Sequence, residues 1–207
     1  MYQALNATSQ TLRQFLRTRI EGDPFLFAPA APYRARGMVV SLQTPIEMRE
    51  AGREGVSVWL YRVLRDDLRA NDPPRRISLT EMKPAPLPMR LHYLVTPITS
   101  REALGDPDTE QYLLGKVLQV LHAQPILRGA ELAGELAGTS VELHVRLEAL
   151  ALEEITRVWD ALDGSYQLSV SYEVSVVELD SAREPDGFEP VQQLHTELAQ
   201  IVAGVSP

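Results

Sequence analysis

The chain has 207 residues, of which 44% are hydrophobic, and this is enough to bury one core. It contains no cysteine, so disulfides, thiol chemistry and cysteine-ligated metal sites are excluded. The net charge of −8 argues against a nucleic-acid partner, because phosphate binding needs a concentrated positive surface. Residues 1–20 do not read as a secretory signal and no apolar run could span a bilayer, so we expect no membrane partner and folding in the cytoplasm.

The first part of the chain predicts one helix and two strands. Apolar residues recur at helical spacing over residues 3–20, and a proline-rich loop follows at 23–36. A short apolar run at 38–42 indicates a strand. In the strand predicted at 55–64 both alternating faces are mostly apolar, so we expect this strand to be central in the sheet and covered on both sides.

The middle of the chain contains a segment that fits neither a helix interior nor a central strand. Residues 69–88 hold Asn71, Asp72 and five prolines, so we predict an exposed, stiff excursion. Residues 89–96 then alternate between two faces, which indicates another strand that ends before Pro97.

The clearest helix begins near Asp106 and ends before Pro125. Asp106 is suited to the N-cap, Pro107 to the first turn, and the acidic charge to the positive end of the helix dipole. The apolar residues of this helix follow at the spacing of one helical face: Leu114, Val117, Leu118 and Leu121.

The later part predicts a strand at 141–147 with one polar face, a helix at 152–162, and a long strand over 166–179 with the clearest two-residue period of the chain. The order α-β-β-β-α-β-α-β indicates an α/β (α+β) fold, with helices packed on one mixed sheet of about four to five strands. We assign residues 1–180 to this domain and 181–207 to a linker and C-terminal extension. Apolar residues in the extension recur at helical spacing, which predicts a short helix or a partner-binding arm: Val191, Leu194, Leu198, Ile201 and Val202.

No group of residues in the sequence points to catalysis or to a cofactor. The four histidines, His92, His122, His144 and His195, have no ligand-like spacing to one another. HExxH, GxSxG, GxGxxG and Walker A patterns do not occur. We therefore predict no catalytic, cofactor-binding or metal-binding residue and no enzyme activity. The alternative of a small hydrolase would depend on His92 or His122.

Five parts of the chain carry a resemblance when they are read in their order. They are VWLYRV at 58–63, PLP with LHYLVT at 86–96, LGKVLQVLH with PIL at 114–127, LEEI with VWDAL at 152–162, and YQLSVSYEV at 166–174. Over residues 5–180 the chain resembles the cap, or tail-terminator, proteins of phage-tail-like extracellular contractile injection systems of the antifeeding-prophage and virulence-cassette type. The segment after Asp180 matches this family poorly.

The resemblance implies a tail-terminator-like fold without catalytic residues. It implies a subunit of a six-membered ring that closes the distal end of the inner tube, ends tube growth and anchors the last sheath layer. The implied partners are further copies of the chain, the inner-tube protein and the sheath protein. Assembly in the cytoplasm would precede release as part of an extracellular particle.

Interface residues are expected in the stiff excursion and its neighbouring strands, because proline lowers the entropy lost on docking, and in the apolar C-terminal extension. The candidates are Tyr61, Arg62, Asp66, Arg75, Arg76, Arg90, Val191, Leu194 and Leu198. An alternative to capping is a soluble adaptor or chaperone that recruits tube subunits or cargo without joining the particle.

Overall fold

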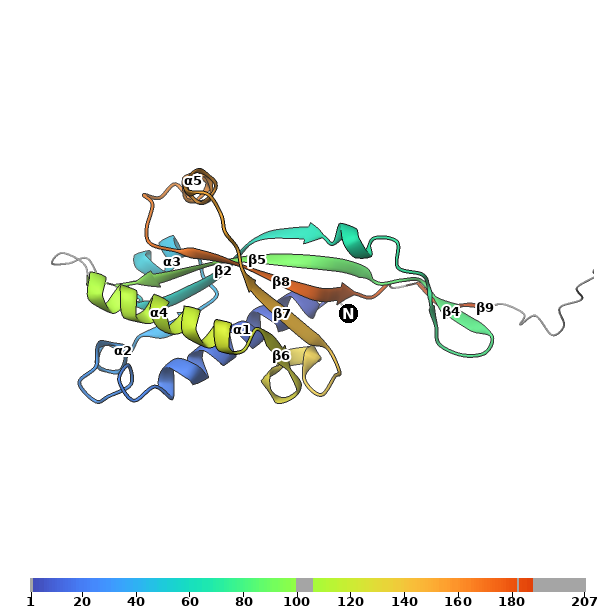
Figure 1. Ribbon diagram of the computed structural model, residues 1–207, viewed down its shortest axis with the longest axis horizontal. Helices are drawn as coiled ribbons and strands as arrows, with labels where there is room; N and C mark the ends of the chain where they lie inside the picture. Colours follow the sequence, from blue (N-terminus) through green and yellow to red (C-terminus); the bar gives the residue numbers. More distant parts are fainter. Residues whose placement is uncertain (1, 100–105, 182, 188–207) are drawn as a thin grey trace, which may run out of the picture.

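The computed structural model describes residues 2–99, 106–181 and 183–187, and it shows one large sheet with helices on both faces and a small second sheet at one end (Figure 1). The large sheet has the strand order β1-β2-β5-β8-β7-β6, in which β1 and β2 are parallel and the other neighbours are antiparallel. The predicted α+β class, a mixed sheet with helices packed on it, is confirmed.

The strands of the large sheet are β1 (Val39–Ser41), β2 (Gly55–Arg65), β5 (Leu87–Ile98), β6 (Ile126–Arg128), β7 (Glu142–Leu147) and β8 (Val170–Leu179). The small sheet is formed by β3 (Arg75–Arg76), β4 (Glu81–Lys83) and β9 (Asp186–Gly187). The large sheet thus has six strands where four to five were predicted, because β6 is too short to show a two-residue period. The predicted excursion contains β3 and β4 at its far end.

The helices are α1 (Ala4–Glu21), α2 (Pro32–Ala35), α3 (Pro45–Glu50), α4 (Pro107–Ala123) and α5 (Leu152–Ala161). Three short 3-10 turns complete the regular structure: η1 (Asp67–Arg69), η2 (Gly129–Glu131) and η3 (Gly134–Leu136). The predicted start of α4 is confirmed, since the Thr109 N–H donates to Asp106 Oδ1 at 3.1 Å and Pro107 occupies the first turn. Within the part of the chain described, no helix combines the length and the apolar composition that crossing a membrane requires.

The main core lies between the sheet and the helices α1 and α4, which cover the same face (Figure 1). Leu16 and Ile20 of α1 and Leu113 of α4 are fully buried there, against strand residues such as Tyr93 and Val174. Helical spacing brings these apolar residues to one side of each helix, while strand alternation brings the odd-numbered residues of β5 to the same layer.

The opposite face of the sheet, called the second face below, has a smaller core. Trp159 of α5 is fully buried against Leu94 of β5, with Trp59 and Tyr61 of β2 beside it. The Trp159 Nε1–H donates to Ser169 Oγ at 3.1 Å, which satisfies the only polar atom of the buried indole. Helix α5 covers only part of this face, so the rest of it is available to polar side chains.

The prediction that the strand at 55–64 is central and covered on both sides is wrong for its second half. Residues 55–58 are buried, but Arg62, Val63 and Arg65 are exposed. The reason is that β1 pairs with β2 only along residues 55–57. The long strand predicted from residue 166 begins instead at Val170, after a bend at Leu168 in which Ser169 Oγ donates to the Gln167 carbonyl at 3.1 Å.

The contact between β1 and β2 requires glycine at position 55. Gly55 has φ +131°, and a Cβ there would lie 2.0 Å from the carbonyl oxygen of Val39. Gly115 in α4 has open space around it.

We expect Gly55→Ala to lower the free energy of unfolding by about 2–4 kcal/mol, because the backbones of β1 and β2 would have to move apart. The matched control Gly115→Ala should raise it by up to about 1 kcal/mol. Urea denaturation measures both, and equal effects would contradict the requirement.

Candidate functional site

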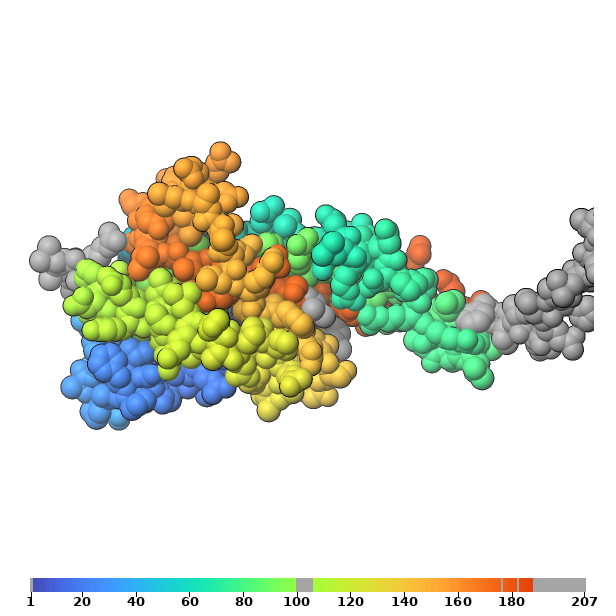
Figure 2. Space-filling view, viewed as in Figure 1, coloured from blue at the N-terminus to red at the C-terminus, as the bar shows by residue number. Residues whose placement is uncertain are grey.

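The small sheet projects from the end of the large sheet as an arm, defined here as residues 75–83 with 186–187 (Figures 1 and 2). Its strands are two or three residues long, and none of its residues is buried. Three aliphatic or thioether side chains are exposed on it, Ile77 by 52%, Leu79 by 76% and Met82 by 36%. A sheet this small has no core of its own, so the arm gains little stability from burial and offers apolar surface to a partner.

The base of the arm is held by one carboxylate of the large sheet. Glu178 of β8 accepts hydrogen bonds of 2.7 Å from Arg75 Nη2 at both oxygens, and a third of 2.7 Å from Arg69 Nη2. Arg69 also pairs with Asp72 at 2.8 Å, and Lys83 pairs with Asp180 at 3.4 Å. The hydrogen bond to Glu178 is the main cause that raises the pKa of Arg69 above its ordinary value, and the hydrogen bond to Asp72 acts in the same direction. The arm is therefore fixed to β8 by charge-assisted contacts rather than by packing.

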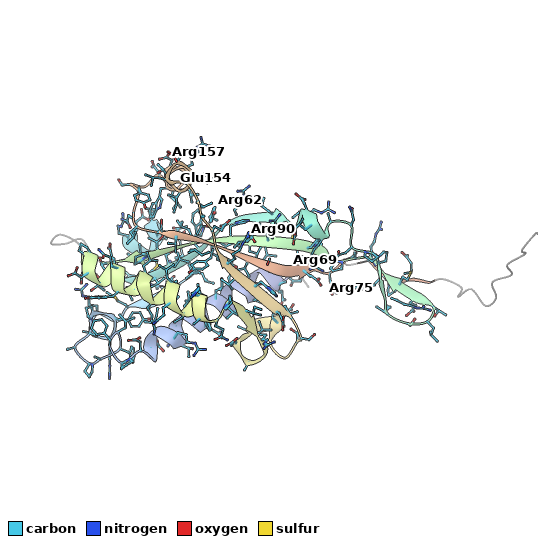
Figure 3. All side chains as sticks on the ribbon, viewed as in Figure 1. Arg62, Arg69, Arg75, Arg90, Glu154 and Arg157 are labelled. Carbon is cyan, nitrogen blue, oxygen red and sulfur yellow. The ribbon has the colours of Figure 1, made fainter. Side chains whose placement is uncertain are left out.

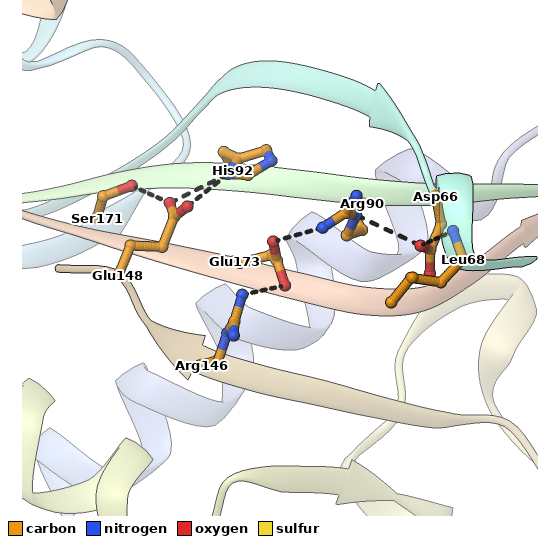
Figure 4. Close-up of polar contacts among 8 residues, drawn as sticks. All are labelled: Asp66, Leu68, Arg90, His92, Arg146, Glu148, Ser171 and Glu173. Atoms are coloured by element: carbon orange, nitrogen blue, oxygen red, sulfur yellow. Dashed lines mark hydrogen bonds and ion pairs between the residues drawn. The ribbon is translucent and has the colours of Figure 1, made fainter. Parts of the chain in front are cut away.

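A chain of ion pairs continues from this base across the second face (Figure 4). Asp66 lies 3.5 Å from Arg90 Nε, and Arg90 Nη1 lies 3.6 Å from Glu173 Oε2. The other oxygen of Glu173 accepts a hydrogen bond of 3.1 Å from Arg146 Nη2. Asp66 and Glu173 are both more than nine-tenths buried, so their charges depend on these arginines.

A second polar group lies beside the first and joins β5, β7, β8 and β2. The carboxylate of Glu148, just after β7, lies 3.0 Å from His92 Nδ1 at both oxygens and accepts a hydrogen bond of 2.6 Å from Ser171 Oγ. Ser171 Oγ also lies 3.0 Å from Tyr61 Oη. Burial is the main cause that raises the pKa of Tyr61, so its hydroxyl remains protonated and can donate.

The fold brings together three residues whose spacing in the sequence suggested no site. Ligand atoms of His92, Glu148 and Glu173 all lie within 4.8 Å of one another, close enough to hold a metal ion in principle. Each carboxylate already has partners of its own, two arginines for Glu173 and His92 with Ser171 for Glu148. A cation would have to displace these contacts, so the geometry favours a polar network over a metal centre.

The same geometry does not fit a serine hydrolase. Ser171 is 2% exposed and donates to Glu148 instead of to His92. A nucleophilic serine needs a base at its Oγ and access for the substrate, and Ser171 has neither a histidine contact nor an exposed hydroxyl.

The structure places the predicted interface residues in three different settings. Arg62 is exposed on the second half of β2, and Arg75 and Arg76 lie on the arm (Figure 3). Tyr61, Asp66 and Arg90 belong to the networks of the second face. The last three, Val191, Leu194 and Leu198, lie outside the described residues. In Figure 3, Arg62, Arg90, Arg69 and Arg75 follow one another between α5 and the arm.

Sequence reasoning missed Arg69, Glu148, Glu173 and Glu178. Glu173 and Glu178 occupy positions that strand alternation would assign to opposite faces of one strand, yet both bind arginines. The available signal was Glu173, a charged residue within the regular two-residue period of a predicted strand. A carboxylate buried at such a position requires a cationic partner on a neighbouring strand.

Comparisons with known proteins identify a family and solved structures of similar fold. A family model described as the Pvc16 N-terminal domain matches residues 7–193. The cryo-EM structure of the PVC sheath/tube terminator of an extracellular contractile injection system, in the extended state, superposes with a TM-score of 0.64 and 18% identity, over 98% of this chain and 65% of that chain. The cryo-EM structure of the anti-feeding prophage tube-terminating cap gives 0.59 and 18%, over 96% and 61%.

The chain therefore spans less than two thirds of the length of either solved protein. No curated protein matches it. At 18% identity the two structures establish a shared fold.

The role of Glu178 can be tested by Glu178→Gln, which keeps the shape of the side chain and removes its charge. We expect a loss of about 1 kcal/mol in the attachment of the arm. Trypsin cleavage after Arg76, which Ile77 follows, should then be about fivefold faster. Glu142→Gln is a matched control, since Glu142 pairs at 3.0 Å with the exposed Arg128 away from the arm. Equal cleavage rates in both variants would show that strand pairing alone holds the arm.

Proposed function

The chain belongs to the Pvc16 N-terminal domain family, and on this basis we propose that it is a structural subunit that caps the tube of a contractile injection system. The resemblance found in five segments of the sequence is confirmed by the family match and by the two terminator folds. In the proposed assembly six copies form a ring, the ring ends the growth of the inner tube, and it holds the last layer of sheath. The number six rests on the resemblance to the cap family.

The observation that carries this proposal is the similarity of nearly the whole chain to two proteins described as terminators of a tube or of a sheath and tube. The surface of this chain supports the same role. Its described part offers an arm with exposed apolar residues and a polar second face, and His92, Glu148 and Glu173 are engaged in a buried network rather than in an open cleft. Docking, and not catalysis, is the function that this arrangement favours.

Capping follows from an asymmetry between the two sides of the ring. One side presents a surface complementary to the last ring of the tube, and the other side offers no surface for a further ring, so growth stops. Ring closure requires a contact between different surfaces of neighbouring copies. The arm is suited to such a contact because it projects beyond the body of the subunit (Figure 2).

Deletion of the gene for this chain tests the function directly. Particles without it should have tubes of greater and more variable length, or should be unstable at one end, and electron microscopy measures both. The labelled chain should appear at one tip of intact particles, whereas an adaptor or chaperone would be absent from them. Unchanged tube length and integrity after deletion would contradict the capping role.

The arm can be tested without disturbing the fold. The double variant Ile77→Ser/Leu79→Ser removes two exposed apolar side chains, so the free energy of unfolding should change by less than about 0.5 kcal/mol. Its incorporation at particle ends should nevertheless fall by about tenfold or more, measured by quantitative immunoblotting of purified particles. Leu152→Ser/Leu168→Ser is the control, with side chains 63% and 43% exposed away from the arm. Equal incorporation of both variants would exclude the arm as a contact.

A further inference from the structure

An arginine-lined pocket of about 530 Å³ lies between α1, α2 and the edge strand β1. It is at the end of the molecule opposite to the arm, near α2 in Figure 1. Its four arginines are Arg13 and Arg17 of α1, Arg34 of α2 and Arg53, which follows α3. Its one acidic side chain is Glu21 of α1. Four guanidinium groups against one carboxylate is an unusual local balance in a chain with a net charge of −8.

Most of these arginines have no carboxylate partner within the described residues. Glu21 is used by Arg17, whose Nε donates to it at 2.8 Å. Arg34 lies over the ring of Phe27 at 5.3 Å, and Arg53 donates to the uncharged Gln43 at 3.3 Å. Arg13 lines the pocket without a hydrogen bond or ion pair to the described part of the chain. Positive charge is thus gathered in the pocket and only a quarter of it is neutralised there.

A second, independent feature of the pocket is an unsatisfied hydroxyl. Tyr33 lines the pocket and is 2% exposed, and its Oη has no hydrogen-bond partner. The Tyr33 ring lies 6.1 Å from the ring of Phe27, which also lines the pocket. Burial raises the pKa of Tyr33 to about 12, so the group keeps its proton and can donate. A buried donor without an acceptor is costly, and an acceptor from a ligand would relieve that cost.

The wall of the pocket also contains main chain. Residues 37–41, which include all of β1, line it, and β1 is the outermost strand on this side of the sheet. The Val39 N–H donates to Glu54 O at 2.9 Å, toward β2. Because successive residues of a strand direct their N–H and C=O groups to opposite sides, those of Val40 are directed away from β2. An extended chain alongside could pair with them.

We propose that this pocket binds an acidic, extended segment of a partner polypeptide, which pairs with β1 and places carboxylates against Arg13, Arg34 and Arg53. Arginine binds carboxylates through paired hydrogen bonds, and the Tyr33 hydroxyl supplies one more donor. A small anion would use the charge of the pocket but not the strand edge, so the polypeptide accounts for more of the observed features. The site is distinct from the arm and the second face, and it does not depend on the capping role.

The test uses the full chain and a fluorescent hexaglutamate peptide, with binding followed by anisotropy. The peptide should bind, binding should weaken as salt is raised, and a hexaglutamine peptide should not bind. Arg13→Gln/Arg34→Gln should weaken binding by about tenfold or more. The control Arg128→Gln/Arg157→Gln removes the same charge from exposed positions elsewhere and should bind like the unmodified chain. Equal losses in the two double variants would overturn the proposal, because they would indicate unspecific attraction.

Three further measurements distinguish other occupants and other causes. Tyr33→Phe removes only the hydroxyl and should weaken binding by about threefold or more, even if the arginine variant were to fold poorly. Amide hydrogen exchange of Val40 should slow when the peptide is bound, and an unchanged rate would reject pairing with β1. Tighter binding of inorganic phosphate or of a single-stranded oligonucleotide than of hexaglutamate would reject a polypeptide ligand.

Discussion

The antiparallel pairing of β5 with β8 is the contact on which the other parts of the molecule depend. It runs from Leu87 opposite Leu179 to Val95 opposite Val170, through the middle of the large sheet. Strand alternation gives the pair one apolar face, where α1 and α4 form the main core, and one mostly polar face. Leu94 supports α5 near one end of the second face, and Glu178 holds the arm near the other.

The polar face shows how the sheet tolerates buried charge. Glu173 is 7% exposed and lies between Arg90 and Arg146, while the carboxylate of Glu148 is shared by His92 and Ser171. Removing one partner from such a group leaves an uncompensated charge, so each contact constrains the positions of the others. The strands β2, β5, β7 and β8 are thereby joined through side chains as well as through main-chain hydrogen bonds. A rigid sheet of this kind is a suitable support for a projecting arm.

The surfaces available for assembly lie at opposite ends of the long axis (Figure 1). The arm has exposed apolar side chains and little internal support, so docking would add to its stability. The pocket contains arginines without a carboxylate partner in the described part of the chain, and the main-chain groups of Val40 are directed away from β2 beside them. Contacts between unlike surfaces are the kind that form rings when the rotation closes. The fold is shared with two terminator proteins, and the two surfaces differ in chemistry, as the proposed capping role requires.

Local patterns in the sequence determined the helices α1, α4 and α5, the strands β5 and β7, and the α+β class, because hydrophobic period, caps and prolines act over a few residues. They also indicated that an exposed, proline-rich segment departs from the body near residue 69. Only the tertiary structure decided that the second half of β2 is exposed, that Glu178 binds Arg69 and Arg75, and that Tyr33 is buried beside four arginines. These contacts join residues that are distant in the chain, and a local period carries no information about which strands become neighbours.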